Sequence, residues 1–165
     1  MTREARVYRL ESNGPAETGL SKMSLDPADF QSDLPDQHLH VCFEDEDLGL
    51  SVGVWTTTSM QEAFGPYPGD EFMCILEGRV AMVDADGVEV PVEEGQSFCI
   101  RNGIPISWKQ EGFLRKFFIT YENPAASAPR ITSAEGGVIV LDHTQLEAGL
   151  ERLDATDPFE ISGPA

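Results

Sequence analysis

The chain has 165 residues, of which 41% are hydrophobic, and its 29 acidic residues against 11 basic ones give a formal net charge of −18. This length suits one domain that buries a sizeable core. So negative a surface repels phosphate backbones and anionic lipids, and we therefore expect no nucleic acid and no membrane as partners. The polar, basic first ten residues differ from a secretory signal, and no apolar run is long enough to span a bilayer, so we expect a cytoplasmic protein.

The N-terminal part of the chain contains few regular elements. Residues 1–20 predict a short strand and a loop. The run Asp-Pro-Ala-Asp-Phe at 26–30 predicts one helical turn, because Asp is a favoured N-cap residue and Pro suits the first helical position. Short strands rich in Val, Trp and Thr follow at 38–43 and 50–58. We expect residues 1–44 to form an extension that packs on the body of the domain.

The clearest pattern lies in the middle of the chain. The run Gly-Pro-Tyr-Pro-Gly at 65–69 predicts a loop, because its two prolines remove backbone donors. Beyond it, short apolar segments alternate with turns that contain glycine. Strands are expected at 72–77, 79–83, 88–92, 97–101, 105–109 and 113–122. Many short strands without a helical period between them predict an all-β barrel or sandwich, not a parallel α/β fold.

The C-terminal segment, 124–165, has two interpretations. Residues 124–129 contain only Pro, Ala and Ser, which is the composition of a linker. The stretch at 141–146 resembles the stretch at 25–30, since in each an apolar–Asp pair precedes a short helical turn, and the tail would then open a second barrel. In the other interpretation, a strand at 137–141 and a short helix pack on the one barrel.

Two sequence motifs make the middle of the chain resemble the cupin superfamily. Glu71, followed by six residues and Gly78, matches the end of the first cupin motif, Gly-x5-His-x-His-x(3,4)-Glu-x6-Gly. Gly95 and Gly103 match the two glycines of the second, Gly-x5-Pro-x-Gly-x2-His-x3-Asn, and the hairpin turn at 84–87 falls between the motifs. The resemblance implies a double-stranded β-helix, a jelly-roll barrel of the RmlC-like type, over residues 45–123.

Three further segments, Gly-Val-Trp at 53–55, Tyr-Pro-Gly-Asp-Glu at 67–71 and Arg-Lys at 115–116, point to one group within this superfamily. They are similar to the histidine-poor cupins of the ethanolamine-utilisation and ureidoglycine aminohydrolase group. Some relatives in that group carry two cupin domains in one chain, which bears on the interpretation of the tail as the start of a second barrel.

The chain departs from the family at the metal-ligand positions. By resemblance, the ligand histidines would fall at Gly65 and Tyr67, or Phe64 and Pro66 with the longer spacing, and at Ile106. Of the four ligands that the family uses, Glu71 alone is present. A transition metal needs three or four nitrogen, oxygen or sulfur ligands in fixed geometry. We therefore expect no tightly bound metal and no cofactor.

A second stretch imitates the first motif. Residues 38–44 read His-x-His-x3-Glu, and on a strand His38 and His40 share one face and could bind one ion. The glycine that should follow falls on Ser51, however, so we favour a partly exposed edge strand over a metal site. His143 stands alone and is expected at the surface.

The resemblance also implies a pocket inside the barrel. In a cupin, the side chains at the positions of Glu71 and Ile106 point inward, and strand alternation puts Met73 and Trp108 on the same faces. Tyr67 would lie at the pocket mouth and Trp55 on an adjoining strand. The expected ligand-binding residues are Trp55, Tyr67, Met73, Arg101, Ile106 and Trp108, although both tryptophans could equally belong to the core.

Glu71 in an apolar barrel would be costly as a bare charge. It is therefore either neutral or paired with a cation, for which Lys116 and Arg101 are available. A carboxylate beside a lysine could act as a general acid–base pair, which makes Glu71 and Lys116 the expected catalytic residues. A buried pair could also do no more than tie two strands together.

Three functions are compatible with this pattern. The loss of metal ligands and the aromatic pocket favour a metal-free or weakly metal-binding cupin domain that binds a small polar metabolite. The alternatives are a small-molecule hydrolase or isomerase of the aminohydrolase-like cupin type, and the non-catalytic half of a bicupin. Barrels with free edge strands often pair or cover them, so we expect a homodimer.

Overall fold

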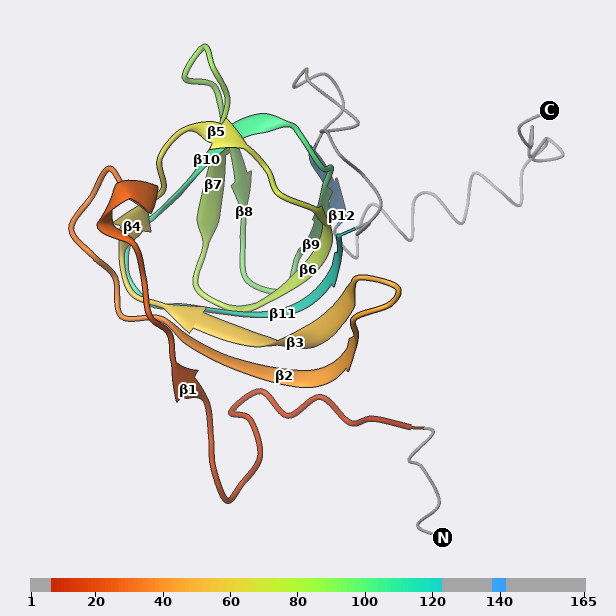
Figure 1. Ribbon diagram of the computed structural model, residues 1–165. Coiled ribbons are helices and arrows are strands. Elements are labelled where there is room, and N and C mark those ends of the chain that lie inside the picture. Colours follow the sequence, from red (N-terminus) through yellow and green to blue (C-terminus); the bar gives the residue numbers. More distant parts are fainter. Residues whose placement is uncertain (1–6, 123–137, 142–165) are drawn as a thin grey trace, which may run out of the picture.

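The computed structural model describes residues 7–122 and 138–141, which form a barrel of twelve strands with one 3-10 turn (Figure 1). In chain order the elements are β1 (Ser21–Lys22), η1 (Pro27–Asp29), β2 (His38–Asp45), β3 (Leu50–Thr57), β4 (Met60–Gln61), β5 (Gly65–Pro66), β6 (Asp70–Glu77), β7 (Val80–Val83), β8 (Glu89–Val92), β9 (Ser97–Ile100), β10 (Pro105–Gln110), β11 (Leu114–Tyr121) and β12 (Val138–Leu141). No helix within these ranges is long and apolar enough to cross a membrane.

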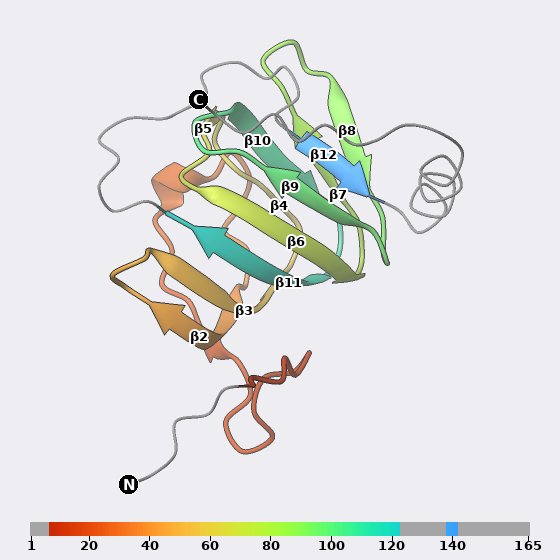
Figure 2. The ribbon, with the colours of Figure 1, turned by 90° about the vertical axis from the view of Figure 1, so that its right-hand side faces the viewer.

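Two antiparallel sheets make the barrel. The larger has the order β1-β2-β3-β11-β6-β9-β12. Figure 2 shows its strands from β2 to β12 side by side in this order. The other has the order β4-β10-β7-β8, with β5 pairing to β10. Because β11 lies between β3 and β6, and β9 beside β6, strands far apart in the chain are neighbours. This arrangement confirms the expected jelly-roll barrel.

Strand alternation places the core between the two sheets. On β6 the buried residues are Glu71, Met73 and Ile75, and on β11 they include Leu114 and Lys116. Successive side chains of a strand point to opposite faces, so every second residue of both strands faces inward. The same alternation in the second sheet buries Val80, Met82, Ile106 and Trp108.

A close approach between strands explains one glycine of β3. Gly53 lies opposite Phe118 of β11, and a Cβ at Gly53 would sit 2.3 Å from the backbone oxygen of His40 on β2 and 2.8 Å from the Cζ atom of the Phe118 ring. Glycine therefore leaves room for this ring on the inner face of the larger sheet.

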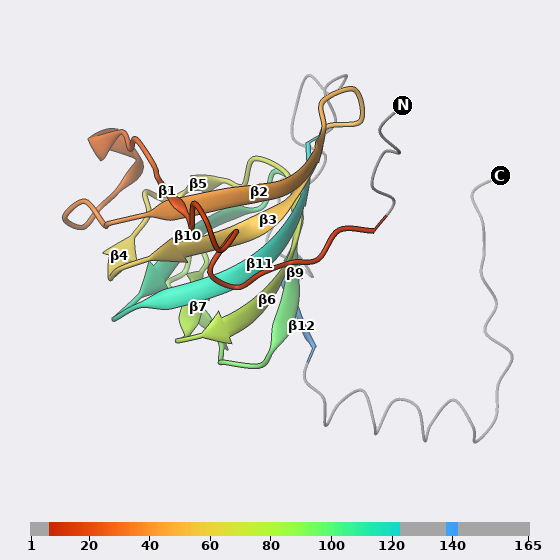
Figure 3. The ribbon, with the colours of Figure 1, turned by 90° about the horizontal axis from the view of Figure 1, so that it is seen from below.

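The ends of the described chain lie along the larger sheet. Residues 7–20 run across the outer face of this sheet (Figure 3). There the centroid of the Tyr8 ring lies 5.1 Å from that of the Phe43 ring. At the other end β12 confirms the strand expected at 137–141, and it pairs with β9 of this same barrel. The linker at 124–129, residues 142–146 of the repeat and His143 lie outside the described residues.

Three local details refine the predictions. The helical turn at 26–30 is a short 3-10 turn, capped by Asp26, whose Oδ1 accepts a hydrogen bond from the backbone N of Ala28 at 2.9 Å. The loop expected at 65–69 begins with β5, which bridges to β10. Finally, β2 extends to Asp45 and lies inside the larger sheet between β1 and β3.

Candidate functional site

A cavity of about 920 Å³ opens between the strands. Its walls come from the inner faces of β2, β3, β6, β10 and β11 and from the segment 62–68; Figure 1 looks along the ring of strands that surrounds it. Aromatic rings form much of the wall: Trp55, Tyr67, Trp108, Phe118 and Tyr121. Concave sites of this size that combine apolar walls with a few polar groups are typical of small-molecule pockets.

Glu71 is the centre of a hydrogen-bonded array on this wall. Its Oε1 accepts a hydrogen bond from Nζ of Lys116 at 2.8 Å, and its Oε2 accepts one from the Tyr67 hydroxyl. The side chains of Glu71 and Lys116 are only 10% and 9% exposed. The expected pairing of Glu71 with Lys116 is therefore present, and Tyr67 completes it.

Lys116 reaches Glu71 across the inner face of two strands. Lys116 lies opposite Ile75 of β6, whereas Glu71 lies opposite Thr120 of β11. Between these positions Nζ also donates to the Sδ atom of Met73 at 3.0 Å.

Two indole rings flank the same ammonium group. Nζ of Lys116 lies 4.8 Å from the centroid of the Trp55 ring and 4.7 Å from that of Trp108. The rings meet edge to face with centroids 5.6 Å apart, and Nε1 of Trp108 donates to Oε1 of Gln110 at 2.8 Å, which fixes that ring. A cation over a desolvated indole face is attracted by the ring quadrupole, by about 2 kcal/mol at such sites.

Burial is the main cause that raises the pKa of Tyr67 well above its ordinary value near 10, and the neighbouring Glu71 raises it further. Tyr67 is therefore a neutral hydroxyl that donates a proton in its hydrogen bond to Glu71 at every physiological pH.

Glu62 is a site residue that the sequence did not reveal. Its backbone bridges to Phe30, its backbone N donates to the carbonyl of Trp108 at 2.9 Å, and its side chain lines the cavity. Burial raises the pKa of Glu62 to about 7, Lys116 opposes that shift, and Glu71 and Asp29 add to it. No side chain of the described residues forms a hydrogen bond with its carboxylate.

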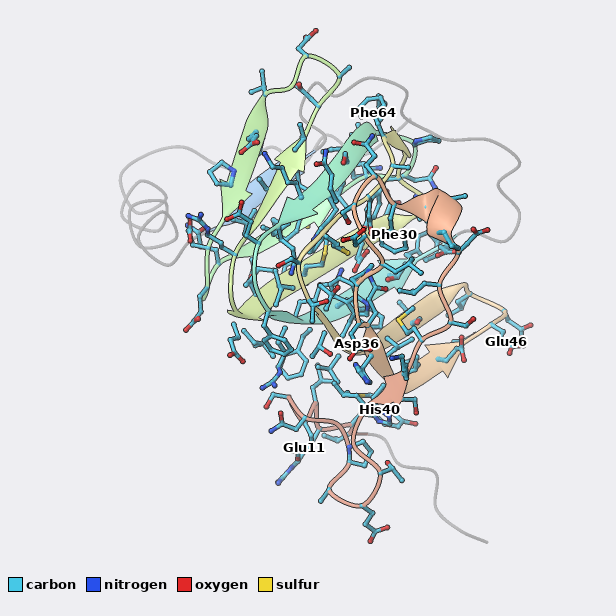
Figure 4. The ribbon with its side chains drawn as sticks, turned by 90° about the vertical axis from the view of Figure 1, so that its left-hand side faces the viewer. Glu11, Phe30, Asp36, His40, Glu46 and Phe64 are labelled. Carbon is cyan, nitrogen blue, oxygen red and sulfur yellow. The ribbon has the colours of Figure 1, made fainter. Side chains whose placement is uncertain are left out.

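The charged residues around the cavity are mostly acidic. Lys116 is the one basic residue that lines it within the described chain, against six acids: Glu44, Asp45, Glu46, Glu62, Glu71 and Glu122. Glu46 lies at the tip of the β2–β3 hairpin (Figure 4). The field in the cavity mouth therefore favours positively charged solutes.

Three predicted ligand-binding residues do not line the cavity: Met73, Arg101 and Ile106. Met73 is fully buried in the core cluster. Arg101 does not pair with Glu71 and does not line the cavity; its Nε donates to Oδ1 of Asp70 at 2.8 Å. The cause is strand alternation: the cross-strand neighbours Ile100 and Glu71 face inward, so Arg101, which follows Ile100, and Asp70, which precedes Glu71, face outward. Ile106 is buried in the core cluster and does not line the cavity.

The residues present do not fit the metal that the cupin resemblance implies. Two of the expected ligand positions, Gly65 and Ile106, are cross-strand neighbours without donor side chains. His38 and His40, the pair that resembles the histidines of the first motif, lie on either side of Leu39 in β2. Because Leu39 lines the cavity, both histidines face away from it. Figure 4 labels His40. Within the described ranges, no three His, Cys, Asp or Glu side chains are grouped as metal ligands.

Comparison with known proteins supports the architecture. Residues 45–118 match the family described as the EutQ-like cupin domain. A protein of unknown function from Pseudomonas syringae pv. tomato is 31% identical with a TM-score of 0.58, over 61% of this chain and 43% of that one. The chain thus spans less than half the length of that relative.

Two further structures are more distant. The polyketide cyclase RemF from Streptomyces resistomycificus is 13% identical over 76% of this chain and 87% of that one, with a TM-score of 0.51, a likeness of fold alone. The EutQ protein of Clostridium difficile is 17% identical over 61% of this chain and 81% of that one, with a TM-score of 0.47. No curated protein matches the sequence.

Proposed function

Since this chain carries a cupin domain of the EutQ-like family at residues 45–118, we propose that the barrel binds a small polar metabolite in the cavity around Glu71, without the aid of a metal. The observation that carries the proposal is the array of Tyr67, Glu71 and Lys116 on the wall of a cavity of about 920 Å³. Polar groups placed beside aromatic rings in a cavity are the elements that orient a ligand.

The polar groups of the wall define the chemistry of that ligand. The carboxylate of Glu62 accepts no hydrogen bond from the described side chains, and Glu71 keeps lone pairs beyond its two bonds. Both are acceptors, whereas the one basic group, Lys116, already contacts Glu71, a thioether and two rings. A ligand that presents N–H or O–H donors, and above all one that carries a positive charge, therefore matches this wall.

Proton transfer is a second candidate function, favoured by Glu62. With a pKa of about 7, its carboxyl group is present in both protonation states at neutral pH, which suits a general acid or base. Glu71 and Lys116 would then hold the substrate while Glu62 exchanges the proton. A cupin of hydrolase or isomerase type would work in this way, and the roles expected for Glu71 and Lys116 in catalysis stay predictions.

A thermal-shift screen tests the binding proposal. The probes are matched sets of primary amines, alcohols and carboxylic acids of equal chain length, because a solute that binds the native state raises the melting temperature. We expect amines, and to a smaller extent alcohols, to raise the melting temperature and carboxylic acids to leave it unchanged. Glu62→Gln and Glu71→Gln should each weaken the response, and Glu94→Gln, an exposed acid outside the cavity, should not. Equal responses in all three variants would contradict the proposed site.

A further inference from the structure

We infer that the Lys116 ammonium is a tethered cation that takes the place of the metal ion in this barrel: it neutralises Glu71 and links the two sheets from inside. The inference starts from a mismatch. Glu71 is the one family ligand present, yet its partner is a lysine of the same chain at 2.8 Å. The inference concerns the folded barrel itself and does not depend on the proposed ligand.

Every side of the ammonium group faces a partner that favours positive charge. One N–H points to a carboxylate oxygen and one to a thioether sulfur, and two indole faces lie 4.7 and 4.8 Å away. An ammonium group has three donors and no acceptor, so this shell saturates it. A metal ion could reach Glu71 only by displacing Lys116, because two cations cannot share one buried carboxylate without strong repulsion.

The partners of Lys116 come from both sheets. Glu71 and Met73 belong to β6 and Trp55 to β3, which lie in the larger sheet with Lys116 itself, whereas Trp108 lies on β10 of the other sheet. The position that resembles a metal-ligand histidine, Tyr67, binds the second oxygen of Glu71. One cation thus joins four strands, as a central ion with several protein ligands would.

A double-mutant cycle separates this role from ordinary packing. Lys116→Met keeps an unbranched side chain shorter by one atom and removes its charge, which leaves a buried carboxylate without its cation. We expect its melting temperature to fall by roughly 10 °C. Adding Glu71→Gln to Lys116→Met should recover most of that loss, because both charges are then gone.

Two results would overturn the tethered cation. One is a Lys116→Met protein as stable as the wild type; the other is a double variant whose losses simply add. If Lys116→Met does not fold, the double variant decides alone: a folded double variant is the expected result, and an unfolded one contradicts the inference.

Chemical rescue provides an independent test. Lys116→Ala removes three methylene groups and the ammonium, which together correspond to n-propylammonium. This cation should raise the melting temperature of Lys116→Ala by clearly more than it raises that of the wild type, and propan-1-ol should not replace it. Equal rescue by both solutes would show that the site needs volume and not charge. Stoichiometric Mn, Fe, Ni or Zn in the purified wild type would also contradict the inference.

Discussion

Adjacent residues of β6 show how differently the two faces of the larger sheet treat a charge. Asp70 points outward and pairs with Arg101 at 2.8 Å, with side chains 22% and 44% exposed. Glu71 points inward and pairs with Lys116 at the same distance, with side chains 10% and 9% exposed. The nitrogen–oxygen distance is the same in the two pairs, but water screens the outer pair far more than the inner one. Burial, not distance, decides which pair matters for stability and function.

The largest effect should follow from breaking the inner pair. Glu71→Ala leaves the Lys116 ammonium buried without its carboxylate, so we expect the free energy of unfolding to fall by about 3–5 kcal/mol. Urea unfolding, followed by tryptophan fluorescence, measures it. A loss no larger than that of an exposed ion pair would mean that the inner pair is screened like the outer one.

The cavity wall also carries an acid, Glu62, that forms no ion pair with the described side chains and makes stability depend on pH. Its pKa is about 7 in the folded state against an ordinary value near 4.5, so between these values the folded protein binds more protons than the unfolded chain. The contribution of Glu62 to stability therefore falls as pH rises from about 4.5 to about 7.

Glu62→Gln removes this titration. The variant should be more stable than the wild type at pH 8, by about 1–3 kcal/mol, and should gain nothing at pH 4. Melting temperatures across this range, with Glu94→Gln as the control, measure the difference. A gain that is equal at both pH values would show that Glu62 is not the titrating group.

Steric crowding should make the same substitution cost more stability at one glycine of the barrel than at another. Gly53→Ala brings a methyl group to 2.3 Å from the backbone oxygen of His40 and 2.8 Å from the Phe118 ring, so we expect a loss of about 1–3 kcal/mol. Gly65→Ala is the matched control, because a Cβ there meets no atom within 4 Å. Differential scanning calorimetry of the two variants measures the contrast, and equal melting temperatures would refute it.

The smallest effect is expected on the outer face. Arg101→Ala removes one partner of a partly exposed ion pair and should cost less than about 1 kcal/mol. Because Arg101 does not line the cavity, ligand affinity measured by calorimetric titration should not change. A tenfold loss of affinity in this variant would instead return Arg101 to the binding site.

Strand alternation made most of the fold predictable. Short apolar segments between glycine turns gave the main strands of the barrel nearly to the residue. The cupin resemblance placed Glu71 on an inward face and strand alternation placed Met73 and Trp108 there, as the structure confirms. Strand alternation also explains the misplaced Arg101. The need of Glu71 for a cation put this residue in the pocket, whereas alternation continued one residue beyond β9 points it outward beside Asp70.

Glu62 could not be predicted in the same way. It follows a strand of two residues and belongs to no motif, so nothing local distinguishes it from the other acids of the chain. Its burial arises from tertiary contacts, the bridge to Phe30 and the backbone bond to Trp108, which no periodicity encodes. The contacts of Lys116 with Trp55 and Trp108 could not be predicted either, because the sequence did not distinguish a tryptophan of the core from one that lines a pocket.

The chain has two tryptophans, and both line the cavity, which permits a direct test of the binding site. A proton–nitrogen correlation spectrum should contain two indole N–H signals, assigned with Trp55→Phe and Trp108→Phe. Titration with the amine that most raises the melting temperature should shift at least one of them in proportion to binding. If that amine binds and both indole signals stay in place, the ligand lies elsewhere and the account of the cavity is wrong.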